Sequence, residues 1–453
     1  MPNLESSWPD WKYPEWREKG GQLTADGWLE GRREVDGAEG LWRVHDGLYE
    51  LSSWVHSHPG GSQWLEITKG TDITEAFEAH HIGPLASKML ENFYVRPAKT
   101  PRNSAFTFHP DGFYRTLKSR VYEKLKGVRP GPSEHSKRLL ETLAIGTLMF
   151  SVLAAVYHSY LLGAVAGHLS NDTKGEAPQL HPLPPGPSSH LSAVNCPPSP
   201  STPGTSSQPA ALQILNHLFY DYRQWRITHA LSHHLFPNTH YDLEISSFEP
   251  LMMFLPSPEK TKLFGITSAV VSPLLYPFFC TFTNKALCLH SRILKTKFHS
   301  QDLISLVLPT AMLLVGRVPV SRVILMWTYI NMISSFWFGV IGLNAAHHHP
   351  EIFHYGDKPR EDRDWGLHTL DATRDRVEVM GSPNLVLVTY GDHSLHHLFP
   401  TIDHVHLSSL YPIMEQTCRE FGYNFKLKTT WDLVTAQFRQ LMRNEPNLKD
   451  QNQ

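Results

Sequence analysis

The pentapeptide His-His-Leu-Phe-Pro occurs twice in this chain, at residues 233–237 and 396–400. Each copy follows a further histidine, which gives two clusters: His229, His233 and His234, and His393, His396 and His397. On a helix these spacings turn every ring to one side, and the following proline ends the helix there. Neutral imidazole is a common ligand of iron and zinc, and rings that converge without cysteine suit iron better than a closed zinc site. A lone buried histidine is usually a core residue, but two copies of one pattern predict a metal site.

Composition argues against several other classes of protein. A net charge of −2 gives no reason to expect nucleic acid as a partner. The four cysteines lie far apart and form no C-x-x-C pair, so neither a disulfide framework nor a cysteine-ligated metal is expected. The N-terminus has no basic region followed by an apolar run, which argues against a secretory signal.

Four uncharged stretches predict membrane contact, at residues 142–167, 263–284, 303–316 and 323–346. A helix needs about 20 apolar residues to cross a bilayer core. The second and fourth stretches have that length, the third is short, and the first is either one long crossing or part of a hairpin. The alternative interpretation is a set of buried core helices in a soluble protein.

The charges around these stretches predict which side of a membrane each part faces. Eight basic residues between Arg115 and Arg138 precede the first stretch and place the N-terminal region in the cytosol. If the two histidine clusters form one site, the chain between them crosses an even number of times. We expect residues 263–284 not to cross, because Pro273 and Pro277 interrupt them.

The N-terminal part has a different pattern. Residues 41–55 predict a short strand, a glycine turn and a helix start, and His-Pro-Gly-Gly follows at 58–61. Alone, that tetrapeptide is simply a turn. Asp72, with Glu75 three residues later, then predicts a capping-box-like helix start, and this helix presents His80 and His81.

Residues 41–95 resemble a cytochrome b5 domain on these motifs. The resemblance implies that His58 and His81 bind haem b from both sides, with His80 as the alternative to His81. Two imidazoles leave no open position on the iron, so such a haem passes electrons and does not bind oxygen. The acidic residues of this region suggest a docking face for a basic reductase, with an ordinary solvated surface as an equally good interpretation; they are Glu66, Asp72, Glu75 and Glu78.

The rest of the chain resembles the membrane fatty acid desaturase and hydroxylase superfamily. Residues 222–238 match its second histidine cluster, residues 391–400 match its third, and Asn344 with His348 matches its Asn-x-x-x-His element. The order of parts resembles that of the insect cytochrome b5-related proteins. The resemblance implies two iron ions, with Asn344 acting through water and with the ligands His229, His233, His234, His348, His393, His396 and His397.

One part of the superfamily pattern is missing. The first cluster should follow the first apolar stretch, but only His168 stands there, without a second histidine at the right spacing. Residues 171–211 are instead rich in proline and serine and predict a disordered insert. His168 is thus a candidate remnant ligand, and His181, His190 and His217 are poor substitutes. The sequence therefore leaves open whether this chain is an active enzyme.

We expect an α+β cytochrome b5 haem domain at residues 36–97, followed by an all-α membrane desaturase-like domain at 139–438. An N-terminal extension (1–35), a linker (98–138) and a C-terminal tail (439–453) complete the chain.

The expected function is desaturation of an acyl chain, on acyl-CoA or a lipid, at the endoplasmic reticulum membrane. Electrons would come from cytochrome b5 reductase through the tethered haem, and the haem domain and histidine clusters would face the cytosol. The alternatives are a haem electron carrier with an inactive di-iron site and a di-iron lipid hydroxylase. The His-x-x-x-His-His spacing, and His393 where front-end desaturases carry Gln, weigh against polyunsaturated-fatty-acid desaturation.

Overall fold

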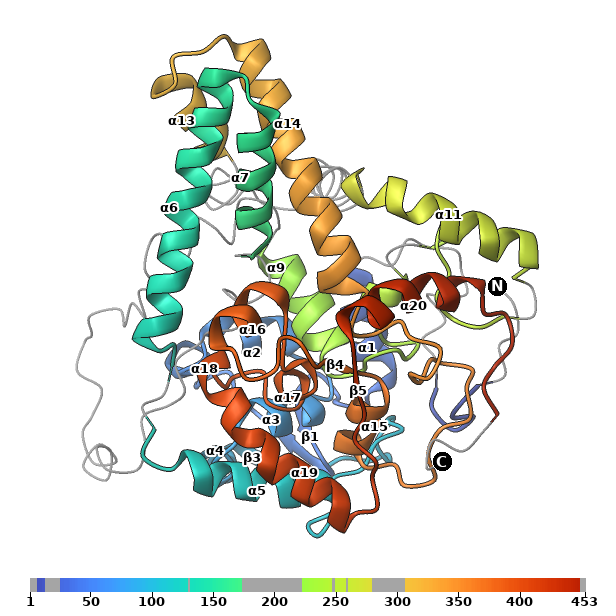
Figure 1. Ribbon diagram of the computed structural model, residues 1–453. Helices are drawn as coiled ribbons and strands as arrows, with labels where there is room; N and C mark the ends of the chain where they lie inside the picture. The colour runs from blue at the N-terminus through green and yellow to red at the C-terminus, as the bar shows by residue number, and fades with distance from the viewer. Residues whose placement is uncertain are drawn as a thin grey trace, which may run out of the picture.

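The computed structural model describes residues 6–12, 25–128, 131–172, 222–246, 249–257, 260–278 and 306–448. It consists of a body that contains most of the elements and a group of apolar helices that projects from it (Figure 1). Residues 173–211 of the predicted proline-rich insert lie outside the described residues, and so do His181, His190 and His217.

The haem-domain region is a small α+β unit, as predicted. Its sheet is antiparallel in the order β1-β2-β3, and Val44 pairs with Gly47 across the predicted glycine turn. The strands are β1 (Trp42–Val44), β2 (Gly47–Tyr49) and β3 (Tyr94–Pro97), and the helices are α2 (Ser62–Thr68), α3 (Thr74–His80) and α4 (Leu85–Leu90).

The first apolar stretch forms a hairpin. Helix α6 (Glu134–Tyr157) begins at Ser133, whose side chain accepts a hydrogen bond from the backbone of Ser136. It ends at His158, which takes a left-handed conformation, and α7 (Tyr160–Asp172) then packs back against α6. Of the two alternatives for residues 142–167, one long crossing and part of a hairpin, the structure has the hairpin.

The later apolar stretches also form helices. Short α13 (Val307–Leu314) packs on α6, and α14 (Val320–Trp337) continues into a π-helical turn, η7 (Phe338–Leu343). Within the described residues, two helical segments are long and apolar enough to cross a membrane, Glu134–Tyr157 and Val320–Gly342.

Helix α11 (Lys262–Phe278) lies differently. It crosses near the base of α14 and packs against α20 (Thr430–Met442), while α6 and α7 stand away from the body (Figure 1). At 17 residues it is shorter than a typical crossing. Its outward face is apolar and exposed, at Leu263, Ile266, Val270, Leu274 and Phe278.

In the part of the body beyond the haem domain that the structure describes, the regular elements are helices apart from a two-residue parallel pair, β4 (Asp375–Arg376) and β5 (Leu427–Lys428). Its helices include α9 (Tyr222–Trp225), the π-helical segment η4 (Arg226–His233), α10 (Leu243–Ser246), α15 (Trp365–Asp371), α16 (Pro383–Thr389), α17 (His393–Leu398), α18 (His404–Leu407) and α19 (Tyr411–Glu420).

The predicted extension and linker both contain ordered, packed structure. Helix α1 (Ala25–Val35) is tied to the body by Trp28, whose indole N–H donates to the carbonyl of Tyr241. Helix α5 (Phe113–Leu125) packs against α15 and α19. Trp8 and Trp11 are buried in the same hydrophobic core. The segments before and after the haem domain are therefore packed into the body, and Ile67 and Ala79 of that domain belong to the same core.

Candidate haem pocket and metal centre

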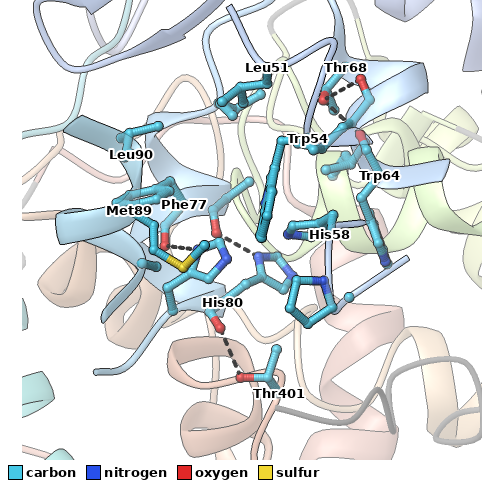
Figure 2. Close-up of a pocket in the computed structure, with 18 of the residues that line it drawn as sticks. Leu51, Trp54, His58, Trp64, Thr68, Phe77, His80, Met89, Leu90 and Thr401 are labelled. Atoms are coloured by element: carbon cyan, nitrogen blue, oxygen red, sulfur yellow. Dashed lines mark hydrogen bonds between the residues drawn. The ribbon is translucent and has the colours of Figure 1, made fainter. Parts of the chain in front are cut away.

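The haem-domain helices and the His-Pro-Gly-Gly turn enclose an apolar cavity of about 190 Å³ (Figure 2). His58 and His81 line it, with their ring centres 6.1 Å apart. Two imidazoles bound at about 2 Å on opposite sides of one metal have ring centres roughly 6 Å apart, so this spacing suits a haem iron. The turn needs its glycines, because Gly61 has φ +100° and a Cβ on Gly60 would lie 2.9 Å from His58.

The environment of both rings favours neutral imidazole with Nε2 directed into the cavity. Nδ1 of His58 hydrogen-bonds the carbonyl of Gly61 at 3.1 Å, and Nδ1 of His81 hydrogen-bonds that of Phe77 at 3.0 Å. Burial lowers the pKa of His58, and it lowers the pKa of His81 to about 3. His80 differs, because its ring lies against Trp64 rather than His58. His80 also lines the cavity, so His81 stays the predicted second ligand because its ring is the one that faces His58.

The acidic residues of this region do not form an open docking face. Asp72 and Glu75 are buried and both pair with Arg102, at 2.7 and 2.6 Å. Glu78 is buried too, and Lys118 and Arg115 of α5 pair with it. The docking-face interpretation is therefore wrong for these three residues, because the predicted linker already neutralises them, and the solvated alternative is equally wrong. Of the predicted four, Glu66 alone stays exposed.

The two pentapeptide repeats lie against each other. The rings of His234 and His397 stack with their centres 4.2 Å apart, and His233 contacts His397 at 5.0 Å. The second cluster is carried by the π-helical segment η4 and its C-cap residue His234, and the third is carried by α17. Single π-helical turns often mark functional sites, and here the turn brings His229 and His234 together with their Nε2 atoms 3.0 Å apart.

Seven histidines fall into two groups that are suited to hold metal ions. In the first group, Nε2 of His347 lies 3.0 Å from Nε2 of His233 and 2.6 Å from Nε2 of His393. Neighbouring ligands on one metal at about 2.1 Å are roughly 3 Å apart, so these spacings suit coordination. The groups are His233, His347, His393 and His397, and His229, His234 and His396.

Carboxylates behind two rings orient them. Asp242 lies 3.0 Å from Nδ1 of His233, and Glu244 lies 2.7 Å from Nδ1 of His229. Nδ1 of His347 hydrogen-bonds the carbonyl of Ala372, so its Nε2 lone pair faces the group. The Nε2 lone pairs of neighbouring histidines converge here, and such lone pairs repel one another unless a cation lies between them. Burial alone lowers the pKa of His233, but Asp242 and Glu244 raise it overall to about 9.

Two histidines expected from the superfamily pattern, His348 and His168, lie outside both groups. His348 stacks on Phe254 at 3.6 Å and hydrogen-bonds His354, so His347 takes the place expected for His348. The helical spacing from Asn344 misled the prediction, because the π-helical turn ends at Leu343. Asn344 is buried, and its Oδ1 has no hydrogen-bond partner among the described residues. His168 is exposed on α7 beside Trp337 and belongs to neither group.

The haem cavity borders directly on the metal centre. Its wall includes Ala230 and Leu231, which lie between His229 and His233, and Pro400 and Thr401, which follow α17. The hydroxyl of Thr401 donates to the carbonyl of His80 at 3.3 Å (Figure 2). Residues of the histidine-bearing segments themselves therefore form part of the wall of the haem cavity.

Comparison with known proteins agrees with this two-part arrangement. A fatty acid desaturase family model matches residues 208–428, and a cytochrome b5-like haem/steroid binding domain model matches residues 30–99. A cytochrome b5-related protein of Drosophila melanogaster is 38% identical over 446 residues, which cover 96% of this chain and 95% of the relative. The chain belongs to the cytochrome b5-related proteins. Membership implies a haem and a desaturase-type iron centre, and the histidines described above fit both groups.

More distant relatives of this cytochrome b5-related chain extend over most of its length. A probable Delta(5) fatty acid desaturase C of Dictyostelium discoideum is 24% identical and covers 86% of this chain and 89% of its own. An acyl-lipid (8-3)-desaturase of Mortierella alpina is 23% identical and covers 85% of this chain and 89% of its own. The chain is thus a fatty acid desaturase superfamily member with a fused cytochrome b5 domain.

Proposed function

We propose that the protein is a membrane oxidoreductase that desaturates an acyl chain, with oxygen as oxidant and with electrons from its own haem domain. The observation that carries the proposal is the shared wall, because residues between and just after the metal-site histidines also line the haem cavity. When bound, the haem supplies electrons singly and the iron centre uses them with oxygen against an unactivated C–H bond.

The chain's own residues have separate tasks in this proposal. His58 and His81 hold the haem from both sides, and the two histidine groups hold two iron ions, with Asn344 acting through water. Asp242 and Glu244 keep the ring nitrogens of their histidines directed at the metal. The cavity wall excludes water between the two sites, because Leu231 and Pro400 are apolar.

The arrangement of helices supports a multi-pass membrane protein of the endoplasmic reticulum. The projecting helices carry exposed apolar side chains, such as Ile145 on α6 and Leu161 on α7, which are 67% and 76% exposed. Helix α11 fits along the membrane surface, with its apolar face toward lipid. In this proposal the haem domain and both groups lie on the cytosolic side, which the basic residues before α6 support. Cytochrome b5 reductase is the proposed electron donor and acyl-CoA or a membrane lipid the substrate.

A second candidate is a membrane-anchored electron carrier with an inactive metal centre. It is favoured by one observation: His168, the remaining histidine at the place of the first cluster, is exposed and lies in neither group. In this case the haem would be reduced normally, but lipids would be unchanged.

The test is expression of the full chain in yeast, followed by metal analysis of the detergent-purified protein and by lipid profiling. The proposal predicts about two non-haem iron ions for each haem, and new double bonds that are absent from a His396→Ala strain. Haem iron alone, with no lipid product, would assign the carrier function. Hydroxylated lipids would identify the centre as a hydroxylase instead.

A further inference from the structure

Tyr114 contacts helix α3, which ends directly before the haem-pocket residue His81, and helix α17, which carries three histidines of the metal centre. Its hydroxyl oxygen lies 3.1 Å from the carbonyl oxygen of Glu78 and 3.2 Å from that of Leu398. Glu78 lies in α3, three residues before His81, and Leu398 is the last residue of α17, directly after His397. One phenol proton is thus shared between acceptors on the haem side and on the metal side.

Packing holds this phenol in place. Tyr114 is fully buried, its ring meets Trp365 edge-on at 4.7 Å, and it stacks on Phe399 at 5.8 Å. Its backbone N–H donates to the carboxylate of Asp364. Burial raises the pKa of Tyr114 well above its ordinary value, so the hydroxyl remains a donor at any physiological pH.

The same helix makes further contacts with the haem side. Nζ of Lys118 donates to the carbonyl of Glu78 at 2.8 Å and to its carboxylate at 2.7 Å, and Arg115 pairs with that carboxylate. These contacts reach only the haem domain. Tyr114 therefore differs from its neighbours in α5, because its hydroxyl also reaches α17.

We infer that Tyr114 is a positioning residue shared by the two sites: through one hydroxyl it fixes the haem-ligand helix α3 relative to the metal-ligand helix α17. The haem domain then works as a docked part of the body and not as a carrier that swings on a linker. This inference rests on the proposed function only for the identity of the two bound groups, the haem and the iron ions. The hydrogen bonds of Tyr114 to Glu78 and Leu398 join parts of the chain and do not depend on that identity.

The test compares Tyr114→Phe with wild type in the full-length protein purified with haem and iron. The haem is reduced under nitrogen and mixed with air-saturated buffer, where each haem loses one electron and dissolved oxygen accepts it. The part of the rate that requires non-haem iron is obtained by subtracting the rate of protein prepared without that iron. We expect this part to fall by about 10- to 100-fold in Tyr114→Phe, because a misplacement of about 1 Å between reacting groups can cost about 100-fold in rate.

A matched control is Tyr276→Phe, which removes another buried phenol whose hydroxyl donates to Gln437 at 2.7 Å. The control should keep the wild-type rate, and both variants should keep wild-type haem and iron contents. An unchanged rate in Tyr114→Phe overturns the inference, and so does loss of haem or iron, which would make the residue a support of one site.

A second measurement separates this inference from the proposed function. Hydrogen exchange of the full chain should speed up in both α3 and α17 in Tyr114→Phe, and in neither helix in Tyr276→Phe. If the wild type shows no iron-dependent rate, the proposed function fails, and the inference then stands or falls on this exchange result alone.

Discussion

The haem pocket and the metal centre are both built from histidine side chains, but they space these side chains differently. In the pocket, His58 and His81 face each other across an apolar cavity, each held by a backbone carbonyl. In the metal centre, seven rings are in mutual contact, and carboxylates stand behind two of them. A planar macrocycle needs space between its ligands, whereas small cations need nitrogen atoms that converge. The comparison teaches that spacing and the groups behind the rings, more than the number of histidines, decide what each site holds.

The largest effect is expected when one histidine ring of the metal centre is removed. His393→Ala should lower metal affinity by more than about 100-fold, because loss of a ligand exceeds the usual effect of losing an outer partner. Haem content should not change, since His393 lies outside the haem cavity. Non-haem iron and the Soret band are measured on the same sample. His109→Ala, at an exposed histidine, is the control. Loss of haem along with iron would show that the two sites are not independent.

The reverse change addresses the haem pocket. His81→Ala should remove one axial ligand and either release the haem or leave it five-coordinate, with non-haem iron retained. His80→Ala should keep a six-coordinate spectrum, because the ring of His80 contacts Trp64 and not His58. Absorption and electron paramagnetic resonance spectra distinguish these states. If the outcomes of the two variants are exchanged, His80 is the ligand.

The sequence was sufficient for features that repeat or lie close together in the chain. For residues 142–167 the sequence left one long crossing and a hairpin open, and after the glycine turn it predicted a helix start where strand β2 forms. The features that it predicted correctly are local: the two pentapeptides, the His-Pro-Gly-Gly turn and the first strand with its glycine turn. Their spacing alone carries the necessary geometry.

Features that depend on tertiary contacts were missed. In His347-His348-His349 the backbone after η7 decides which ring enters the group, and a helical spacing rule chose the wrong one. Asp242 and Glu244 are ordinary acidic residues until the fold places them behind His233 and His229. The sequence predicts only a linker where helix α5 lies, because the residues that α5 contacts, such as Glu78 and Leu398, are far away in the sequence. The Asp242-Leu-Glu244 pattern close after the cluster was the one available sequence signal for the orienting carboxylates.

A milder perturbation of the metal centre tests the role of the carboxylates. Asp242→Asn should weaken metal binding by about 10- to 100-fold without removing a ligand, because the amide no longer fixes the ring of His233 through a charge. Competition with a calibrated chelator gives the affinity. Asp46→Asn, at a side chain that is 93% exposed, should bind as the wild type does. Equal metal affinities for Asp242→Asn and the wild type would show that the charge of Asp242 does not contribute to metal binding.

The smallest expected effect is on the free energy of unfolding, with haem and iron still bound. It concerns the ion pairs that hold the haem domain. Asp72→Asn should lower the free energy of unfolding by about 2 kcal/mol at pH 7, because Arg102 loses a buried partner. Burial alone raises the pKa of Asp72, but Arg102 and hydrogen bonds from Thr74 outweigh it and hold the pKa below the ordinary 3.8. The contribution is therefore complete above about pH 4 and is lost as the pH falls further, since the unfolded chain takes up a proton that the folded chain refuses.

Unfolding of the wild type and of Asp72→Asn between pH 7 and pH 3 measures this contribution. The two curves should converge toward low pH, whereas Glu66→Gln, at the one exposed acidic residue of the group, should run parallel to the wild type throughout. Curves for Asp72→Asn that also run parallel would mean that the charge of Asp72 does not hold the domain. Docking would then depend on apolar contacts and on the hydroxyl of Tyr114, and the haem pocket would be fixed to the metal centre by packing instead of by ion pairs.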